Sequence, residues 1–274
     1  MTLPLEIIDS LQFYIGENEN LLKIFPEVTK YIHNYISYDS FEGDPRMILK
    51  LKINKSINLK PFKNLQVLSC YDNELQELPK LPSSLRKLHC SVNKLQKLPK
   101  LPNSLQILYC NCNELQELPK LPNSLRELYC YINRLQELPE LPNSLQKLNY
   151  NFNKIQELPE LPLSLQELHC NHNQIQELPK LPSSLRELYC SSNQLQELPE
   201  LPLSFQELHC NSNKLQKLPE LPLGLRELFC YNNQLQELPK LPSSLRFLDC
   251  NSNRLVNKDS LIEYCQKNKI SYLI

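Results

Sequence analysis

Apolar and polar positions along the chain follow a repeat of twenty residues, LxxLxCxxNxLxxLPxLPxS. The repeat first registers at Leu65 and last at Leu245, and an asparagine recurs at every twentieth position from Asn73 to Asn253. These positions define ten copies. A fixed period of this length predicts a solenoid in which each copy forms one coil and the coils bury a shared core.

Each copy contains one predicted strand and one return segment. The stretch LxxLxC places apolar residues two apart, as in Leu68 and Cys70, which predicts a strand with one buried face. One strand per coil predicts a parallel sheet. Proline in the Leu-Pro-x-Leu-Pro return fixes φ and removes a donor, so we expect an extended, polyproline-like segment rather than an α-helix. The asparagine after the strand is expected to hydrogen-bond backbone groups at the turn, and stacked copies then form a ladder.

This unit resembles the leucine-rich repeat in the short twenty-residue form typical of bacterial effector proteins, whose motif also contains paired Leu-Pro steps. The resemblance covers residues 65–255. It implies a repeat solenoid, a leucine-rich repeat horseshoe with a parallel β-sheet on the concave face and an extended convex side. It also implies a non-enzymatic protein–protein interaction scaffold that binds its partner on the concave sheet. We therefore expect no catalytic residue, no metal and no cofactor.

Composition argues against disorder and against two classes of partner. The chain holds 22 prolines, but nine Pro-x-x-Pro pairs supply 18 of them within the repeats, and 41% of the residues are hydrophobic. Lys and Arg number 30, as do Asp and Glu, so the overall charge favours neither nucleic acid nor an anionic membrane. The chain shows no signal-peptide pattern and no apolar run of membrane-spanning length. We expect a soluble protein that does not follow the standard secretory route.

Nine of the eleven cysteines share the slot at the end of the strand, and Tyr150 occupies that slot in the remaining copy. Cys112 and Cys265 lie outside it. Reduced buried thiols, disulfides and zinc ligation are the three interpretations. The absence of a CxxC pair and the in-register row favour reduced thiols, and so an intracellular, cytoplasmic protein. Buried thiols lack the low pKa of a nucleophile. Tyr150 is too large for this slot, which predicts a local rearrangement over 149–152.

The strand side chains that flank the buried leucine and cysteine are expected to face solvent on the concave sheet. The slot between Leu and Cys is rich in Tyr, His and Phe, the slot before this Leu holds five acids and two bases, and the slot after the Cys is rich in Asn, Ser and Tyr. Aromatic and amide side chains on a rigid sheet are typical of recognition surfaces. We predict the following partner-binding residues: His89, Tyr109, Tyr129, Glu167, His169, Glu187, Tyr189, Glu207, His209, Phe229 and Tyr231.

Three other interpretations of this surface were weighed. The rings could stack only to support the sheet, and this alternative stays open. Single-stranded nucleic acid requires a basic groove, whereas the neighbouring slot is acidic. His169 and His209 lie two repeats apart, roughly 10 Å at strand spacing, which is too far for one shared metal ion. His172 could approach His169 from the turn.

Both ends of the chain depart from the repeat. Residues 256–274 predict a C-terminal cap with a helix that begins near Asp259 or Ser260 and a final strand. Residues 46–64 predict an N-terminal capping coil with strand character at 48–53. Apolar spacing in residues 1–45 predicts a helical N-terminal segment.

Two roles are open for this N-terminal segment. It could be a helical cap on the first coil. Alternatively, Leu3-Pro-Leu-Glu-Ile-Ile, Leu21-Leu-Lys-Ile and Val28-Thr-Lys-Tyr-Ile-His resemble an F-box, although the usual tryptophan is absent and Pro26 interrupts the middle. That resemblance implies a Skp-type adaptor as partner and a role as substrate receptor of a cullin-RING ubiquitin ligase.

Overall fold

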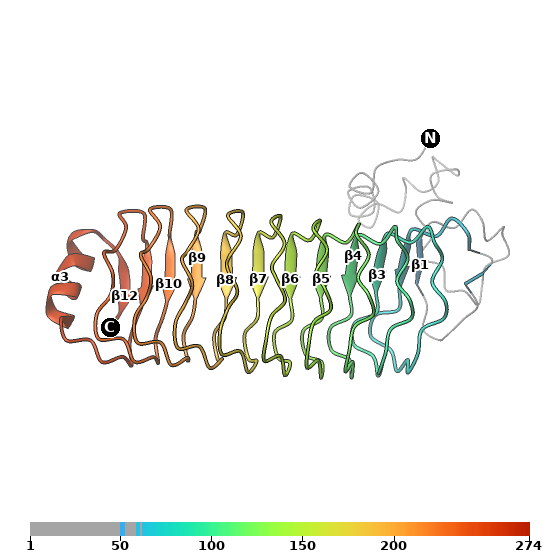
Figure 1. The fold of residues 1–274 in the computed structure, drawn as a ribbon, viewed down its shortest axis with the longest axis horizontal. Helices are drawn as coiled ribbons and strands as arrows, with labels where there is room; N and C mark the ends of the chain where they lie inside the picture. The colour runs from blue at the N-terminus through green and yellow to red at the C-terminus, as the bar shows by residue number, and fades with distance from the viewer. Residues whose placement is uncertain (1–49, 53–58, 61) are drawn as a thin grey trace, which may run out of the picture.

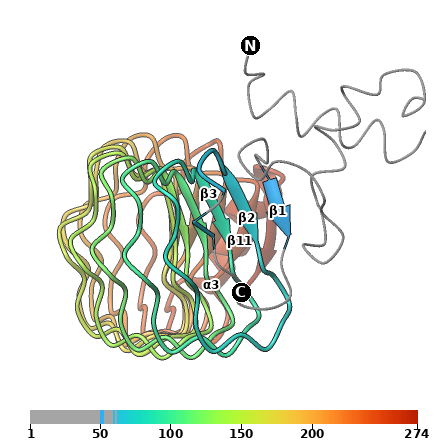
Figure 2. The same cartoon turned by 90° about the vertical axis from the view of Figure 1, so that its right-hand side faces the viewer.

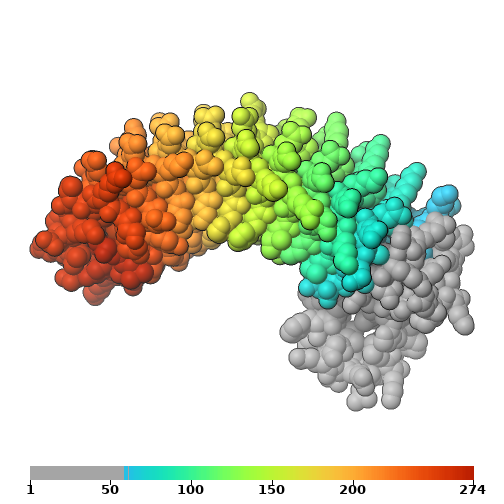
Figure 3. Space-filling view, turned by 90° about the horizontal axis from the view of Figure 1, so that it is seen from below, coloured from blue at the N-terminus to red at the C-terminus, as the bar shows by residue number. Residues whose placement is uncertain are grey.

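The computed structural model describes residues 50–52, 59–60 and 62–274. The helical segment predicted for 1–45, with its F-box alternative, lies outside these residues. The described chain winds as successive coils along one axis (Figure 1) and curves into an arch (Figure 3). Strands lie on one side of every coil (Figure 2), the inner side of the curve. The predicted solenoid with a concave parallel sheet is therefore confirmed.

One sheet of twelve parallel strands, each of three residues, runs through the described chain in sequence order. The strands are β1 (Lys50–Lys52), β2 (Val67–Ser69), β3 (Lys87–His89), β4 (Ile107–Tyr109), β5 (Glu127–Tyr129), β6 (Lys147–Asn149), β7 (Glu167–His169), β8 (Glu187–Tyr189), β9 (Glu207–His209), β10 (Glu227–Phe229), β11 (Phe247–Asp249) and β12 (Ser271–Leu273). A helix, α3 (Lys258–Lys267), separates the last two strands. Neighbouring repeats pair at an offset of twenty residues, as Leu188 does with Leu208.

Leucine and cysteine fill the core as the repeat predicts. In the coil that contains β3, the side chains of Leu85, Leu88, Cys90 and Leu95 are fully buried. The middle residue of each strand from β3 to β10 is buried between two half-buried neighbours. Because coils repeat this set, one continuous apolar core extends from Leu59 to the C-terminal cap.

Asparagine forms the predicted ladder, and Asn193 shows its geometry. The buried side-chain amide donates to the carbonyl oxygens of Cys190 at 3.1 Å and Ser191 at 3.2 Å in its own coil. It also donates to the carbonyl oxygen of Cys170 in the preceding coil at 2.9 Å. Its own Oδ1 accepts from the backbone N–H of Ile175 at 3.1 Å. One side chain therefore satisfies backbone groups of two coils at once.

A left-handed residue precedes each of these asparagines, which the sequence reasoning did not predict. The ten residues have φ between 53° and 58°, and none is glycine: Asp72, Val92, Cys112, Ile132, Phe152, His172, Ser192, Ser212, Asn232 and Ser252. A non-glycine residue in this region costs about 1–3 kcal/mol. Val92 and Ile132 are β-branched, so the hydrogen bonds of the following asparagine must hold the turn in place.

Serine forms a second ladder, although it appeared in the repeat motif without a role. Ser104 donates to the carbonyl oxygens of Ser83 at 2.7 Å and Leu85 at 2.6 Å in the preceding coil. Equivalent bonds recur along the solenoid. Gly224 replaces the serine in one copy, and a Cβ there would lie 3.3 Å from the carbonyl oxygen of Phe205.

The rearrangement predicted around Tyr150 is not found. Strand β6 keeps its pairing, Phe152 keeps the φ of 56° common to its slot, and Asn153 still donates to the carbonyl oxygen of Tyr150 at 2.9 Å. The neighbours of Tyr150 along the slot are the small thiols of Cys130 and Cys170, so the ring fits between side chains smaller than leucine. Its hydroxyl is buried without a hydrogen-bond partner of normal geometry.

The C-terminal segment closes the core. Helix α3 begins at Lys258, directly after Asn257, which is slightly earlier than the predicted start at Asp259 or Ser260. Leu261 and Cys265 on the helix and Ile270 beyond it are buried against the last coil. Strand β12 then pairs with β11.

We expect Asn193→Ala to lower the free energy of unfolding by about 2 kcal/mol or more, because it leaves buried backbone groups of two coils without partners. Chemical denaturation followed by circular dichroism measures this loss. Asn103→Ala, at an exposed position of the return segment, is the matched control and should leave the transition unchanged. Equal effects of the two substitutions would show that the asparagine ladder does not contribute measurably to the free energy of unfolding.

Tyr150→Phe should raise the free energy of unfolding by about 1 kcal/mol, because it removes a buried hydroxyl that lacks a partner while it keeps the ring. Tyr150→Ala should instead lower it by about 3–5 kcal/mol through the cavity it leaves. The same denaturation experiment compares both variants. A destabilised Tyr150→Phe variant would mean that the hydroxyl has a favourable interaction in solution.

Candidate binding site on the concave sheet

Two rows of side chains project from the concave sheet, one from each end residue of the three-residue strands. The acidic row consists of the first residues: Val67, Lys87, Ile107, Glu127, Lys147, Glu167, Glu187, Glu207, Glu227 and Phe247. The aromatic row consists of the third residues: Ser69, His89, Tyr109, Tyr129, Asn149, His169, Tyr189, His209, Phe229 and Asp249. Parallel pairing holds members of each row at the spacing of adjacent strands, about 4.8 Å.

Rings of the aromatic row form two stacks that Asn149 on β6 separates, and two rings outside the row, Tyr71 and Phe247, extend these stacks at their outer ends. In the C-terminal stack, successive ring centroids are 4.2–4.8 Å apart with interplanar angles of 10–30°: His169–Tyr189, Tyr189–His209, His209–Phe229 and Phe229–Phe247. Strand spacing brings the faces of neighbouring rings into contact. The stack therefore orders these side chains before any partner binds.

The N-terminal stack is less regular. Tyr109 and Tyr129 lie parallel with centroids 4.7 Å apart, whereas His89 is tilted against both Tyr71 and Tyr109. The ammonium group of Lys87 lies 5.5 Å from the centroid of the Tyr109 ring. This end of the sheet thus carries a basic group, unlike the C-terminal stack.

Four consecutive strands, β7 to β10, each present a glutamate in the acidic row. Lys147 on β6 forms an ion pair with Glu167, at 2.7 Å between Nζ and Oε1. Burial and the neighbouring carboxylates of Glu167 and Glu207 raise the pKa of Glu187. Burial and like charges at strand spacing therefore both oppose ionisation of Glu187.

Tyrosine hydroxyls take part in the same electrostatic system. Tyr189 donates to Oε2 of Glu207 at 2.6 Å, and Tyr129 donates to Oε2 of Glu127 at 3.3 Å. Burial, with contributions from these carboxylates, raises the pKa of both phenols. Both hydroxyls therefore stay protonated at neutral pH and can donate these hydrogen bonds to the carboxylates.

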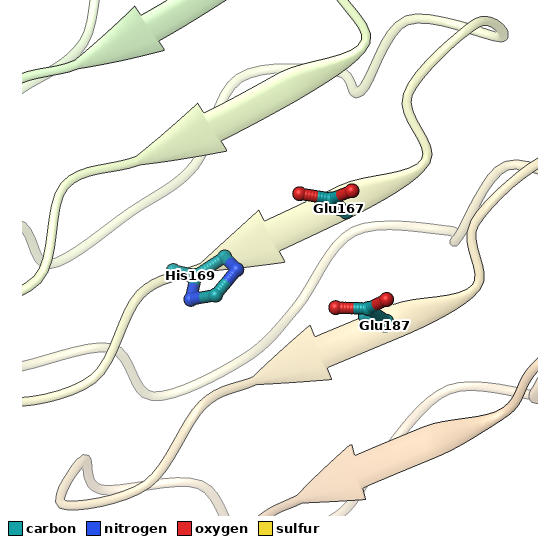
Figure 4. Close-up of side chains that lie close together, drawn as sticks. All are labelled: Glu167, His169 and Glu187. Carbon is teal, nitrogen blue, oxygen red and sulfur yellow. The ribbon is translucent and has the colours of Figure 1, made fainter. Parts of the chain in front are cut away.

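Each histidine of the C-terminal stack lies beside two glutamates. Figure 4 shows the carboxylates of Glu167 and Glu187 side by side on β7 and β8, with His169 farther along β7. One ligand atom of each of the three residues lies within 4.8 Å of the others. The same grouping recurs in Glu207, His209 and Glu227. Burial lowers the pKa of both histidines, so both imidazoles are neutral at pH 7.

All eleven residues predicted to bind a partner are half-buried, and ten lie on the concave strands. Seven of them lie on the adjacent strands β7 to β10: Glu167, His169, Glu187, Tyr189, Glu207, His209 and Phe229. The structure assigns the other three on strands, His89, Tyr109 and Tyr129, to the N-terminal stack. Tyr231 lies just beyond β10. Sequence reasoning omitted Glu227 and Lys147 from the site and compared His169 only with other histidines.

The expectation that every side chain flanking the core residues faces solvent is wrong at several positions. In the slot after the cysteine, Ser91 and Asn111 are buried, and the Ser91 hydroxyl donates to Oδ1 of Asn111 at 2.6 Å. Ser191 and Asn211 repeat this contact. Small polar residues in this slot hydrogen-bond to the same slot of the neighbouring coil. Part of the slot therefore stabilises the fold and is not available to a partner. His172, in the turn, is exposed and stacks on the exposed ring of Phe152, with centroids 4.2 Å apart.

The thiols belong to the core. Ten of the eleven cysteines, all of them free, are buried, and Cys112 is half-buried. Burial raises the pKa of Cys210 to about 12 and that of Cys110 well above its usual range. Such thiols stay protonated and lack the thiolate character that a nucleophile needs.

An open groove of about 910 Å³ follows the turns beyond the sheet and is lined by glutamine with glutamate or lysine from successive repeats, beginning at Gln156 and ending at Gln236. Its lining holds no histidine, cysteine or serine. Leu163, Leu203 and Leu223 are among the most exposed apolar side chains of the described chain, at 80%, 88% and 82%. Neither feature assembles an acid, a base and a nucleophile.

Glu187→Gln should raise the thermal unfolding temperature at pH 7. A carboxyl whose folded pKa is raised contributes stability at low pH and loses it as the pH rises through that pKa, so the ionised Glu187 destabilises the fold at neutral pH. The gain should disappear at about pH 3–4, where the carboxyl of the wild type is protonated. Glu160→Gln, at an exposed position, is the control. A gain that persists in acid would assign the effect to something other than charge.

No helix in the described part of the chain is long and apolar enough to cross a membrane. Curated proteins give no match to the chain. A family profile described as "Leucine Rich repeats (2 copies)" matches residues 163–203.

Solved structures of bacterial proteins are similar to this one. YopM from Yersinia enterocolitica has a TM-score of 0.70 and 38% identity, covering 78% of this chain and 53% of that chain. YopM from Yersinia pestis, described as a leucine-rich effector protein, has a TM-score of 0.65 and 35% identity, covering 75% and 65%. A Shigella effector LRR domain has a TM-score of 0.50 and 29% identity, covering 65% and 77%. The match thus spans less than two thirds of either Yersinia protein. The chain is a leucine-rich repeat protein with repeats of twenty residues, structurally similar to these bacterial effectors.

Proposed function

We propose that the chain is a non-enzymatic scaffold that binds a protein partner on the concave sheet, through a basic segment of that partner. The observation that carries the proposal is the patch on β7 to β10, where a continuous ring stack lies beside four successive glutamates. The similar Yersinia and Shigella structures are described as effectors, which supports a binding role for this chain.

Rigidity supports recognition rather than mere stacking. Backbone ladders fix the strands, and the rings of Tyr189, His209 and Phe229 stack on one another, yet all three side chains are only half-buried. A partner that packs on pre-ordered aromatic side chains loses little conformational entropy at the contact. Stacking for stability alone would not require the adjacent row to be acidic.

Charge selects the chemistry of the partner. From β6 to β10 the acidic row presents four glutamates against the single lysine Lys147. Carboxylates that repel one another gain from a cation brought between them, and the planar guanidinium of arginine can bridge two carboxylates with parallel hydrogen bonds. A segment rich in arginine or lysine is therefore the complement of this surface.

The free thiols support a reducing compartment for this activity. Eleven free cysteines, nine of them in one core row, are suited to an environment in which glutathione or thioredoxin keeps thiols reduced. The cytoplasm is the compartment that we propose.

Charge reversal tests the binding surface. The variant with Glu207→Lys and Glu227→Lys changes the concave patch, and the variant with Glu200→Lys and Glu220→Lys makes the same change in net charge at exposed positions of the return segments. Immobilised full chains are used to capture proteins in the presence of EDTA, and captured proteins are identified by mass spectrometry. We expect a partner with a basic segment to bind the wild type and the return-segment variant but to bind the concave variant at least about tenfold more weakly.

A second pair of variants separates aromatic recognition from general apolar adhesion. Tyr189→Ser with Phe229→Ser should also abolish binding of that partner, whereas Leu203→Ser with Leu223→Ser should not. Circular dichroism verifies that each variant is folded. Equal capture by all variants, or loss only with the leucine pair, would contradict binding on the concave sheet.

A further inference from the structure

Two clusters on the concave sheet each combine one histidine with two glutamates. The first comprises Glu167, His169 and Glu187, and the second comprises Glu207, His209 and Glu227. In both, the histidine and one glutamate come from the same strand, and the other glutamate comes from the next strand. Figure 4 shows this arrangement for the first cluster. The clusters are therefore related by two repeats and share one geometry.

The sheet dictates this geometry. Residues two apart on a strand point to the same face, and in-register pairing places the glutamate of the next strand beside the first one. Each cluster is consequently a triangle of one nitrogen and two oxygen donors, with donor atoms within 4.8 Å of one another. Small side-chain rotations would bring such donors to the bond lengths of about 2.0–2.2 Å found around zinc.

We propose that Glu207, His209 and Glu227 bind a zinc ion, and that Glu167, His169 and Glu187 form a second, weaker zinc site. A neutral imidazole with two carboxylates suits zinc better than calcium or magnesium, which prefer oxygen donors alone. Three protein ligands leave a fourth position, open to the concave side, for water or for a side chain of a partner.

Local charge supports the proposal and ranks the two sites. The second cluster lies in a run of carboxylates that repel one another, and a dication between Glu207 and Glu227 relieves that repulsion. In the first cluster, the ammonium group of Lys147 already forms an ion pair with Glu167 at 2.7 Å. Zinc must therefore displace this ammonium group to bind there.

Outer contacts also favour the second cluster. The Tyr189 hydroxyl donates to Oε2 of Glu207, and the His209 ring stacks between Tyr189 and Phe229. Contacts of this kind orient metal ligands and reduce the side-chain entropy that binding would otherwise lose.

One histidine of the same row provides an internal control. His89 occupies the equivalent slot on β3, but the first residue of its own strand is Lys87 and that of the next strand is Ile107. Histidine in this slot therefore does not by itself create a cluster. The two clusters arise only where histidine coincides with glutamate on two adjacent strands.

Zinc titration of the untagged full chain tests the proposal. The chain is first stripped with EDTA, then exchanged into buffer with a phosphine reductant, and zinc chloride binding is measured by calorimetry. We expect one tight and one weaker site. His209→Gln should weaken the tight site at least about tenfold, His169→Gln should do the same to the weaker site, and His89→Gln should change neither. Lys147→Met should strengthen the weaker site about two- to fivefold.

Cobalt(II) serves as a spectroscopic probe of the ligands. Ligation by nitrogen and oxygen gives visible bands without the near-ultraviolet charge-transfer band of cobalt thiolate, so the spectrum distinguishes the clusters from the cysteines. Zinc uptake that persists in the His169→Gln, His209→Gln double variant, or a dominant thiolate band, would overturn the proposal. An unchanged weaker site in Lys147→Met would overturn its assignment to the first cluster.

The zinc site goes beyond the proposed scaffold function and is tested separately. Its titration contains no protein partner, and partner capture is carried out in EDTA. A failure of the chain to bind zinc therefore says nothing about partner capture, and a failure to capture a partner says nothing about zinc binding.

Discussion

Each coil ends its strand with a left-handed residue followed by an asparagine whose amide bonds to two successive coils. This interaction fixes both the turn and the coil-to-coil distance, because Asn193 reaches the carbonyl oxygen of Cys170 only if neighbouring strands stay paired in register. The left-handed turn is costly for residues such as Val92 and Ile132, and it persists because the asparagine satisfies backbone groups that would otherwise be buried without partners. The serine ladder plays the same part at the other side of the coil.

The same register creates the properties of the concave surface. Once strands are held at a spacing of about 4.8 Å, identical slots on neighbouring coils must interact. Rings in such a slot gain from stacking, as Tyr189 and His209 do. Carboxylates in such a slot repel one another, and burial together with the charges of Glu167 and Glu207 raises the pKa of Glu187. The sheet therefore presents stacked rings beside the four glutamates of β7 to β10, which have the single cationic neighbour Lys147 in their row. The proposed binding of a cation, from a basic partner or a metal, rests on that imbalance.

Sequence alone predicts the slots whose role lies within one coil. The buried Leu and Cys, the proline return and the asparagine follow from alternation and backbone chemistry, and the solenoid follows from their period. Roles that arise between coils were missed. Ser91 and Asn111 look exposed by alternation but are buried, and the Ser91 hydroxyl donates to the Asn111 side chain across two successive coils. The clusters could have been found by comparing each histidine with residues two before it and eighteen after it, the offsets that in-register pairing makes adjacent. Tyr150 was misjudged because the volume of its slot depends on its thiol neighbours.

Charge and ring pattern divide the sheet at β6, where Asn149 interrupts the stack and Lys147 interrupts the acidic row. On the N-terminal side, Lys87 accompanies a tilted stack, whereas the C-terminal side combines parallel rings with uninterrupted acids. Because the end residues of β3 to β10 are only half-buried, we expect substitutions there to change the surface more than the core. A set of near-identical repeats can thus carry a polar patch on a uniform frame, and the four successive glutamates of β7 to β10 form the longest acidic run on the described sheet.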